Sequence, residues 1–349
     1  MGQHKLVIGI IGAVFMAGSA AAAVVSVDDA VSHALDQYEN KRTEAVSQLQ
    51  MASLSPAAPV KAQYVKAVEK AVGVSGGLLV EKADSFSLGY EQYAYTYKES
   101  FNGDHIMDYK GAYQGINGSW THRLTDHEGI PEMPDVFRLE TRLAWAQLDY
   151  NGGIQDQSGN HLADVTLSKV PDMTVEARGI MGKEMFVKNI MFMPYTGVGY
   201  RFLRNDTSKK SGSYVLGGTT YIVSGYRRIS QYYYLPLGLE VRKAFLQSWT
   251  LGGNLEYDYL LKGAQASYTP HSANASVSNS QRHGQGYRAS VKLEKDFTHV
   301  GISVEPFVRY WQLQKSDFAC SDYVTGGCFG MIEPANVTQE VGVKMGVIF

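Results

Sequence analysis

The chain has 349 residues, and its 32 Lys and Arg against 34 Asp and Glu give a formal net charge of -2. This balance argues against a nucleic-acid-binding protein, which usually carries a basic excess or stripe. Hydrophobic residues make up 44% of the chain and charged residues 19%, too few apolar residues for a polytopic helical membrane protein. The 36 glycines and 23 tyrosines favour a β-rich protein whose alternate residues face lipid.

The first 23 residues (1–23) have the layout of a secretory signal peptide. Lys5 provides a positive charge, an apolar stretch runs from Leu6 to Met16, and small residues fill 17–23, where they offer several cleavage sites. We expect cleavage near Ala22 or Ala23 and export of the mature protein. An uncleaved anchor is the competing interpretation, because an apolar segment of about 20 residues can span a bilayer.

Residues 24–84 predict a helical leader that is periplasmic or plug-like. Apolar residues recur at helical spacing on both sides of a break at Ser55-Pro56-Ala57-Ala58-Pro59. The pattern leaves open whether the leader forms short periplasmic helices, is partly disordered, enters the barrel described next or binds a partner as a stalk.

Apolar and polar residues alternate over residues 85–349, which is the pattern of β-strands. In the last strand one face carries the apolar side chains of Val337, Val341, Val343, Met345, Val347 and Phe349. The opposite face carries Thr338, Glu340, Gly342, Lys344 and Gly346. About ten strands are predicted, near 86–98, 109–122, 136–150, 173–186, 190–204, 229–245, 248–266, 285–298, 300–316 and 336–349.

These strands are long enough to cross a membrane, which takes roughly 9–11 residues per tilted strand. Tight connections alternate with long polar ones near 151–171, 205–227, 267–284 and 317–335, as in barrels with short periplasmic turns and long outer loops. Large aromatic residues toward the strand ends suit the interfacial girdles, namely Trp249, Tyr150, Tyr200, Tyr233, Phe245, Phe297 and Phe349. We therefore predict an all-β fold, an antiparallel transmembrane β-barrel. A soluble β-sandwich is the alternative, although its strands are shorter.

The signal peptide, the alternating strands and the final segment from Glu340 to Phe349 resemble those of Gram-negative outer-membrane β-barrel proteins of the small porin-like and OmpA-like kind. The resemblance covers roughly residue 85 to the end. It implies location in the bacterial outer membrane, with lipid as a partner. It also implies that the C-terminal strand, through the terminal Phe349, is the signal for the barrel-assembly machinery. It implies no activity, and no soluble partner follows from it.

The polar faces of the strands predict a network of charges in the barrel lumen. Both signs occur in similar number, so the charges can pair. The residues concerned are Arg138, Glu140, Arg142, Glu176, Arg178, Arg201, Glu240, Arg242, Glu256, Asp258, Arg288, Lys292, Glu294, Glu305, Arg309, Glu340 and Lys344. A barrel of about eight to ten strands is barely wide enough for its side chains, so we expect a lumen largely closed by salt bridges. Tyr232, Tyr234, Phe307 and Trp311 are expected to add bulk.

Cys320 and Cys328 lie close together in the last long loop, and in an exported protein this spacing predicts a disulfide.

The nine histidines show no zinc-binding pattern, and no nucleotide-binding or hydrolase motif occurs. We therefore expect no cofactor, no metal site and no catalytic residue. The loops around 206–226 and 268–284 are rich in small polar residues and are expected to be mobile.

Three functions are compatible with this pattern. The first is a structural role, or limited passage of small solutes, for a porin-like barrel with a narrow, charge-paired lumen. The second is a surface adhesin or receptor that uses the outer loops. The third is an omptin-like outer-membrane protease, because omptin-type proteases also use a ten-stranded barrel. That site needs Asp and His near the outer rim, where His105 with Asp104 and Asp108 is the matching cluster. The expectation is that the protein is not an enzyme.

Overall fold

The computed structural model describes residues 84–124, 133–155, 161–246, 248–268, 277–297, 299–321 and 329–349. The predicted signal peptide (1–23) and nearly all of the predicted leader (24–84) lie outside these ranges, so both stay predictions. The first described strand begins at Asp84, one residue before the predicted start of the barrel.

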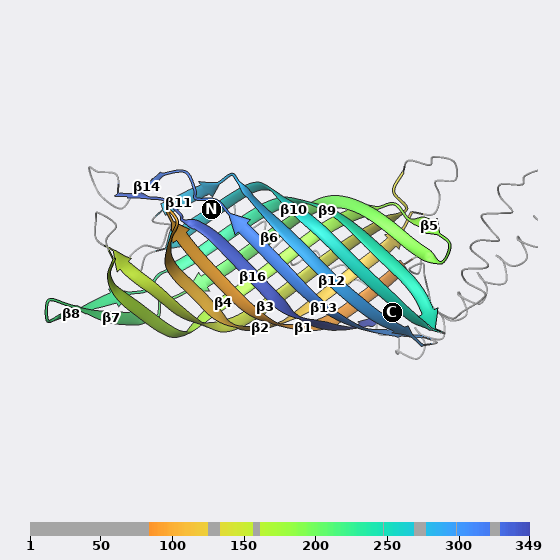
Figure 1. Ribbon diagram of the computed structural model, residues 1–349, viewed down its shortest axis with the longest axis horizontal. Helices are drawn as coiled ribbons and strands as arrows, with labels where there is room; N and C mark the ends of the chain where they lie inside the picture. Colours follow the sequence, from red (N-terminus) through yellow and green to blue (C-terminus); the bar gives the residue numbers. More distant parts are fainter. Residues whose placement is uncertain are drawn as a thin grey trace, which may run out of the picture. The chain divides into compact units, whose positions relative to one another are not determined.

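Ten long antiparallel strands form a closed barrel (Figure 1), which confirms the predicted fold. They are β1 (Asp84–Phe101), β2 (Asp104–Arg123), β3 (Val136–Gln155), β4 (His161–Gly182), β6 (Ile190–Asp206), β9 (Arg227–Leu246), β10 (Trp249–Tyr268), β12 (Gly284–Asp296), β13 (Gly301–Leu313) and β16 (Ala335–Ile348). Each strand pairs with the next, and β1 pairs with β16, from Ser87 opposite Ile348 to Ser100 opposite Ala335. This last ladder closes the sheet and removes its free edges.

Six shorter strands extend the barrel at its ends. β5 (Met185–Val187) pairs with β6, and β11 (Val277–Gln281) pairs with β10. β7 (Ser211–Leu216) pairs with β8 (Thr219–Ser224), and β14 (Ala319–Ser321) pairs with β15 (Phe329–Met331), as two separate two-stranded sheets. The segments around 206–226 and 268–284 therefore contain regular strands. Main-chain pairing in these strands satisfies polar backbone groups of the loops, and the predicted mobility of the loops stays a prediction.

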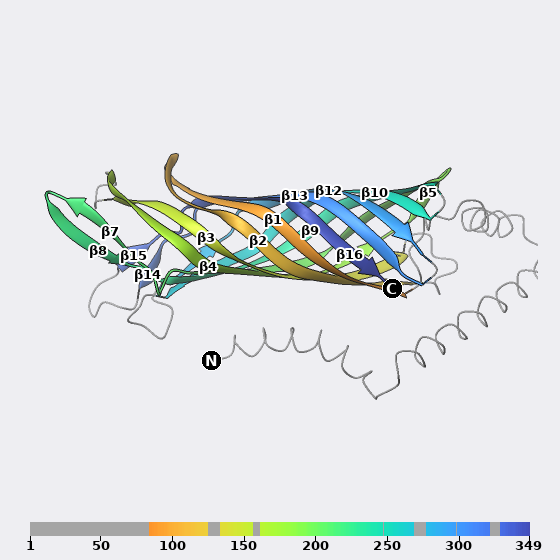
Figure 2. The same ribbon diagram turned by 90° about the horizontal axis from the view of Figure 1, so that it is seen from below.

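The two ends of the barrel differ. At the turn end lie the C-terminus, β5 and short connections (Figure 2), and the main chains of Phe86 and Phe349 are hydrogen-bonded there at 2.8 Å. At the loop end lie β7, β8, β11, β14 and β15. Strands of up to 22 residues exceed what a bilayer crossing requires, so the wall extends past the apolar band toward the loop end.

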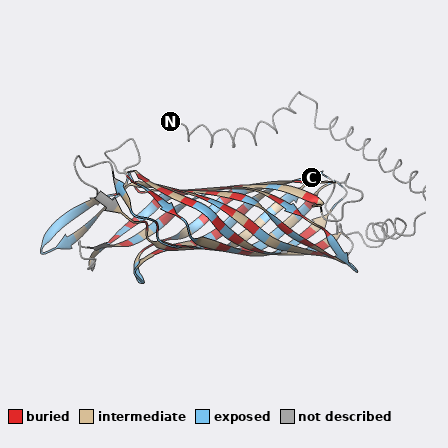
Figure 3. Cartoon of the chain, turned by 90° about the horizontal axis from the view of Figure 1, so that it is seen from above, coloured by how far each residue is buried: buried red, intermediate tan, exposed pale blue. Residues whose placement is uncertain are grey.

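The outward face of the wall is apolar between two aromatic belts. Phe86, Phe245 and Phe349 are exposed near the turn end, and Tyr200 packs on Tyr233 nearer the loop end, with ring centroids 5.1 Å apart. Alternating red and blue segments along the strands in Figure 3 show that buried and exposed residues alternate around the wall. This sidedness follows from the period of two along a strand.

Two shifts in strand pairing change which face of the wall the following residues occupy. Tyr150, predicted for the outward girdle, packs on the buried Tyr109 with ring centroids 5.0 Å apart. The pairing of β3 with β4 shifts between Leu148 and Tyr150, and such a bulge re-aims the following side chains. A second shift, between Leu260 and Lys262 in β10, likewise changes which face each later residue occupies.

No helix among the residues that the structure describes is long and apolar enough to cross a membrane.

Candidate functional site

The centre of the lumen is organised around one carboxylate, Glu340. Its oxygens pair with Arg142 at 2.9 Å, with Arg201 at 2.9 Å and with Arg309 at 3.0 Å. The side chain of Glu340 is 1% exposed. Glu91 forms ion pairs with two of these arginines, at 3.3 Å from Arg142 and 3.2 Å from Arg309. The network therefore connects β1, β3, β6, β13 and β16, from all around the barrel.

A second group of ion pairs adjoins the first. Arg288 lies 2.7 Å from Asp258, 3.0 Å from Glu256 and also pairs with Glu176. Arg178 pairs with Glu256 and, at 2.7 Å, with Glu140. Each carboxylate here faces at least one guanidinium group, as the high cost of a lone buried charge requires.

The remaining predicted lumen residues lie toward the turn end. Arg138 pairs with Glu240 at 2.9 Å, and Lys344 pairs with Glu305 at 3.1 Å. Glu294 pairs with both Arg242 and Lys292. The structure thus places all seventeen predicted lumen residues in ion pairs within the barrel. The sequence reasoning missed Glu91, because aromatic residues on both faces of β1 hide which face is inward.

Aromatic side chains fill the lumen on the loop-end side of this network. Tyr93 stacks on Tyr113 with centroids 5.0 Å apart, and Tyr234 meets Trp311 edge-on at 5.1 Å. Arg201 lies over the Trp311 ring at 5.4 Å, an arrangement that favours a cation. The Tyr234 ring lies against Gly199, where a Cβ atom would come within 2.1 Å of it. Only glycine leaves room for the ring at that position.

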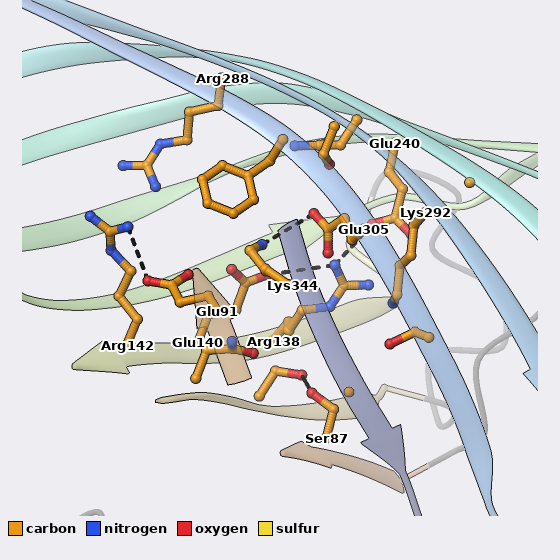
Figure 4. A pocket seen from close by; sticks show the side chains of 18 of the residues that line it. Ser87, Glu91, Arg138, Glu140, Arg142, Glu240, Arg288, Lys292, Glu305 and Lys344 are labelled. Atoms are coloured by element: carbon orange, nitrogen blue, oxygen red, sulfur yellow. Dashed lines mark hydrogen bonds and ion pairs between the residues drawn. The ribbon is translucent and has the colours of Figure 1, made fainter. Parts of the chain in front are cut away.

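A water-accessible cavity of about 170 Å³ lies on the turn-end side of the network. Figure 4 shows Arg138, Glu240 and Lys344 lining it, with Arg142 and Arg288 where the network begins. Its lining carries both signs of charge.

Among the described residues, the side chains of the central network leave almost no water-accessible surface in the lumen. Glu340 is 1% exposed, Tyr234 0% and Trp311 1%, so a water molecule touches almost none of their surfaces. A continuous channel requires walls that water can reach. The ion pairs and the aromatic side chains therefore form a plug built from the wall's own residues, as expected for a barrel of this size.

A smaller polar cluster lies nearer the loop end. The Glu333 backbone, in the connection between β15 and β16, is hydrogen-bonded to Ser316, and its side chain faces Arg228 at 3.5 Å and accepts a hydrogen bond from Gln265. Arg228 also pairs with Glu99. Two carboxylates thus share one guanidinium group in a buried place, and they connect this loop to the wall.

The β7–β8 hairpin projects beyond the loop end (Figures 1 and 3) and exposes apolar side chains. Ile222 is 77% exposed and Val215 is 63% exposed. At its base the Thr207 backbone N–H donates to the Tyr226 carbonyl at 3.0 Å, and the Tyr226 N–H donates to the Thr207 hydroxyl at 2.8 Å. The hairpin is therefore a firm extension of the wall that presents a hydrophobic surface to solvent.

The histidine cluster near the outer rim is only partly assembled. His105 Nε2 lies 3.3 Å from Asp108 Oδ2, and the His105 side chain is 51% exposed. Asp108 also pairs with Lys110 at 3.1 Å. Asp104 belongs to the same strand but forms no ion pair within the described part of the chain. A histidine–carboxylate pair is thus present, held beside a lysine.

The predicted disulfide falls partly outside the described residues. Cys320 lies in β14, whose Ser321 pairs with Phe329 of β15, so the chain doubles back beside it. Cys328 is outside the described ranges, and the bridge stays a prediction. Over those ranges no group of three or more His, Cys, Asp or Glu side chains is arranged to hold a metal ion.

Comparison with known proteins identifies the class by fold. No protein-family model matches the chain, and no curated protein matches its sequence. Among solved structures, the outer membrane protease OmpT from Escherichia coli is similar with a TM-score of 0.56 at 9% identity, over 76% of this chain and 96% of that one. OprG from Pseudomonas aeruginosa gives a TM-score of 0.28 at 10% identity, over 78% and 98%. Neisserial surface protein A gives 0.26 at 12% identity, over 76% and 98%.

The chain has the fold of an outer-membrane β-barrel protein. Its ten-stranded closed wall and apolar outward face are those of a transmembrane β-barrel, and the fold is similar to that of an outer-membrane barrel.

Proposed function

We propose that this protein acts at the cell surface as an adhesin or receptor, with its loop end outward and its lumen closed. The observation that carries the proposal is the projecting β7–β8 hairpin, whose Val215 and Ile222 are exposed. Exposed apolar surface of this kind is typical of interaction sites. Barrels of this class place their short turns in the periplasm and their long loops outside, which puts the hairpin on the cell surface.

Replacing residues 211–224 with a short Gly-Ser turn is expected to abolish binding of protein-containing vesicles to cultured epithelial cells and collagen-coated wells, because the apolar surface is lost while the wall is retained. Binding is measured with fluorescent vesicles. The matched control neutralises the exposed Arg282–Asp317 ion pair, which is 2.9 Å long and lies at the same end, and it should bind normally. Undiminished binding after removal of the hairpin would reject the proposal.

The closed lumen predicts the absence of conductance. Wild-type protein reconstituted in planar bilayers is expected to give no single-channel steps above the lipid background, because the central ion pairs and aromatic rings exclude water. Reproducible steps from the wild-type protein would show that the plug opens, and solute passage would then be the better proposal.

A second candidate function is proteolysis. It is favoured by the fold likeness to an outer membrane protease and by the His105–Asp108 pair at 3.3 Å. A histidine paired with a carboxylate is the arrangement of a general base that activates water.

Vesicles containing the wild-type protein are then expected to cleave unstructured reporter peptides, and His105→Ala should remove this cleavage. His122→Ala provides the matched control, because His122 forms a similar pair with Asp84 at 2.6 Å at the opposite end. Reporter peptides that stay intact with the wild-type protein would end the protease hypothesis.

A further inference from the structure

The β7–β8 hairpin has an unprotected main-chain edge. The sheet consists of these two strands, and within the described residues β8 pairs with β7 alone. β7 lies beside the wall, since a Cβ atom on Gly212 would come within 2.3 Å of Val165. β8 therefore presents its free edge to solvent, and a free edge is a template for another strand.

Nothing in the hairpin sequence blocks that edge. Residues 211–224 read Ser-Gly-Ser-Tyr-Val-Leu-Gly-Gly-Thr-Thr-Tyr-Ile-Val-Ser and contain no charge and no proline. Natural proteins usually protect exposed edges with lysine, proline or bulges. The nearest cations, Lys210 and Arg227, lie outside both strands. An uncharged edge rich in β-branched residues fits an equally uncharged, extended segment.

The pairing register of β7 with β8 determines which main-chain N–H and C=O groups of β8 are left without a partner strand. The turn contains two residues, Gly217 with φ 58° and Gly218 with φ 80°, and Leu216 pairs with Thr219 across it. In such a hairpin the flanking pair is hydrogen-bonded and the pairs then alternate. Thr219, Tyr221 and Val223 therefore bond to β7. Thr220, Ile222 and Ser224 direct their backbone N–H and C=O groups to the open edge.

We propose that the β8 edge pairs with β8 of a second copy of this chain, antiparallel and centred on Ile222. This proposal rests on the adhesin function and names its partner. Thr220 of each copy then lies opposite Ser224 of the other, and about six main-chain hydrogen bonds form. The two Ile222 side chains lie opposite each other on one face, where cross-strand apolar pairs stabilise a sheet.

The geometry places the two copies on facing membranes. The hairpin prolongs the barrel along its long axis (Figures 1 and 2). Antiparallel pairing makes the two hairpins point in opposite directions, so the barrels point toward each other. The charged base of one hairpin then lies beside the glycine tip of the other, which keeps like charges apart. A contact of six-residue strands is small, and many copies acting together supply the strength through avidity.

The test uses two colours of phosphatidylcholine vesicles containing the full-length protein. Wild-type vesicles are expected to cluster and protein-free vesicles to stay dispersed. Ile222→Lys vesicles and Ile222→Glu vesicles should each lose clustering, because like charges then face each other across the pair. Mixing these two populations should restore clustering. Phe318→Lys is the matched control, since Phe318 is also exposed but lies outside the hairpin, and it should cluster like wild type.

Failure of the mixed Lys and Glu populations to cluster, or clustering of either population alone, would overturn the pairing. Dispersed wild-type vesicles would overturn it as well. If such vesicles still bind cells or collagen through the hairpin, the adhesin function stands with a foreign partner. If they bind neither, both proposals fail.

Discussion

Replacing Glu340 with glutamine is expected to lower the free energy of unfolding by about 3–5 kcal/mol, the usual cost of removing one partner from a buried ion pair. Glu340 holds Arg142, Arg201 and Arg309 within 2.9–3.0 Å through its two oxygens. The amide keeps the shape of the carboxylate but turns a hydrogen-bond donor toward three cations. Urea unfolding of the protein in detergent micelles, followed by tryptophan fluorescence, measures the change.

Two further variants separate a charge effect from a general effect of substitution. Glu305→Gln removes a carboxylate whose partner Lys344 is 26% exposed at the cavity, and water there replaces the lost pairing, so a change of about 1 kcal/mol or less is expected. Adding Arg201→Met to Glu340→Gln removes one unpaired cation and should recover part of the lost stability. Equal losses for Glu340→Gln and Glu305→Gln would contradict the central role of Glu340.

The sequence was sufficient to predict the wall of the barrel and part of its aromatic filling, since the predicted lumen residues Tyr232, Tyr234, Phe307 and Trp311 are all buried. Polarity alternates strongly in β12 and β16, so sidedness and pairing followed from the period of two. In β1 both faces carry aromatics. Tyr90 is exposed to the outside while Tyr93 and Tyr95 are buried, and hydrophobicity alone does not distinguish the two faces. The Tyr93–Tyr113 stack was therefore missed.

The hairpin that carries the proposed function was missed for a different reason. Its composition of Gly, Ser, Thr and Tyr is typical of a polar loop, and that composition outweighed a local signal. Gly217 and Gly218 stand between two alternating segments, and this is a recognised sign of a two-residue hairpin turn. The partners of Glu99 and Glu333 were beyond prediction, because their contact joins residues more than two hundred positions apart and depends on barrel closure.

Raising the pH from about 5 to 9 is expected to release the connection between β15 and β16 from the wall. Burial raises the pKa of Glu333 to about 8, and the negative charge of Glu99 adds to the rise, whereas Arg228 opposes it. The folded pKa thus exceeds the ordinary value of 4.5. The folded state therefore binds the Glu333 proton more tightly than the unfolded state. The resulting stabilisation is complete below pH 4.5 and is lost as the pH rises through 8.

Hydrogen exchange of the amides of 329–336, corrected for the intrinsic effect of pH, measures this release. Exchange should rise steeply between pH 7 and 9, around the pKa of about 8. Glu333→Gln keeps the hydrogen-bonding shape without the ionisation, so exchange in this variant should stay slow and independent of pH. Glu99→Gln removes the like charge beside Glu333 and should move the rise to lower pH, because less repulsion opposes ionisation. A rise that persists unchanged in Glu333→Gln would assign the pH dependence to another group and would contradict the sharing of Arg228 by the two carboxylates.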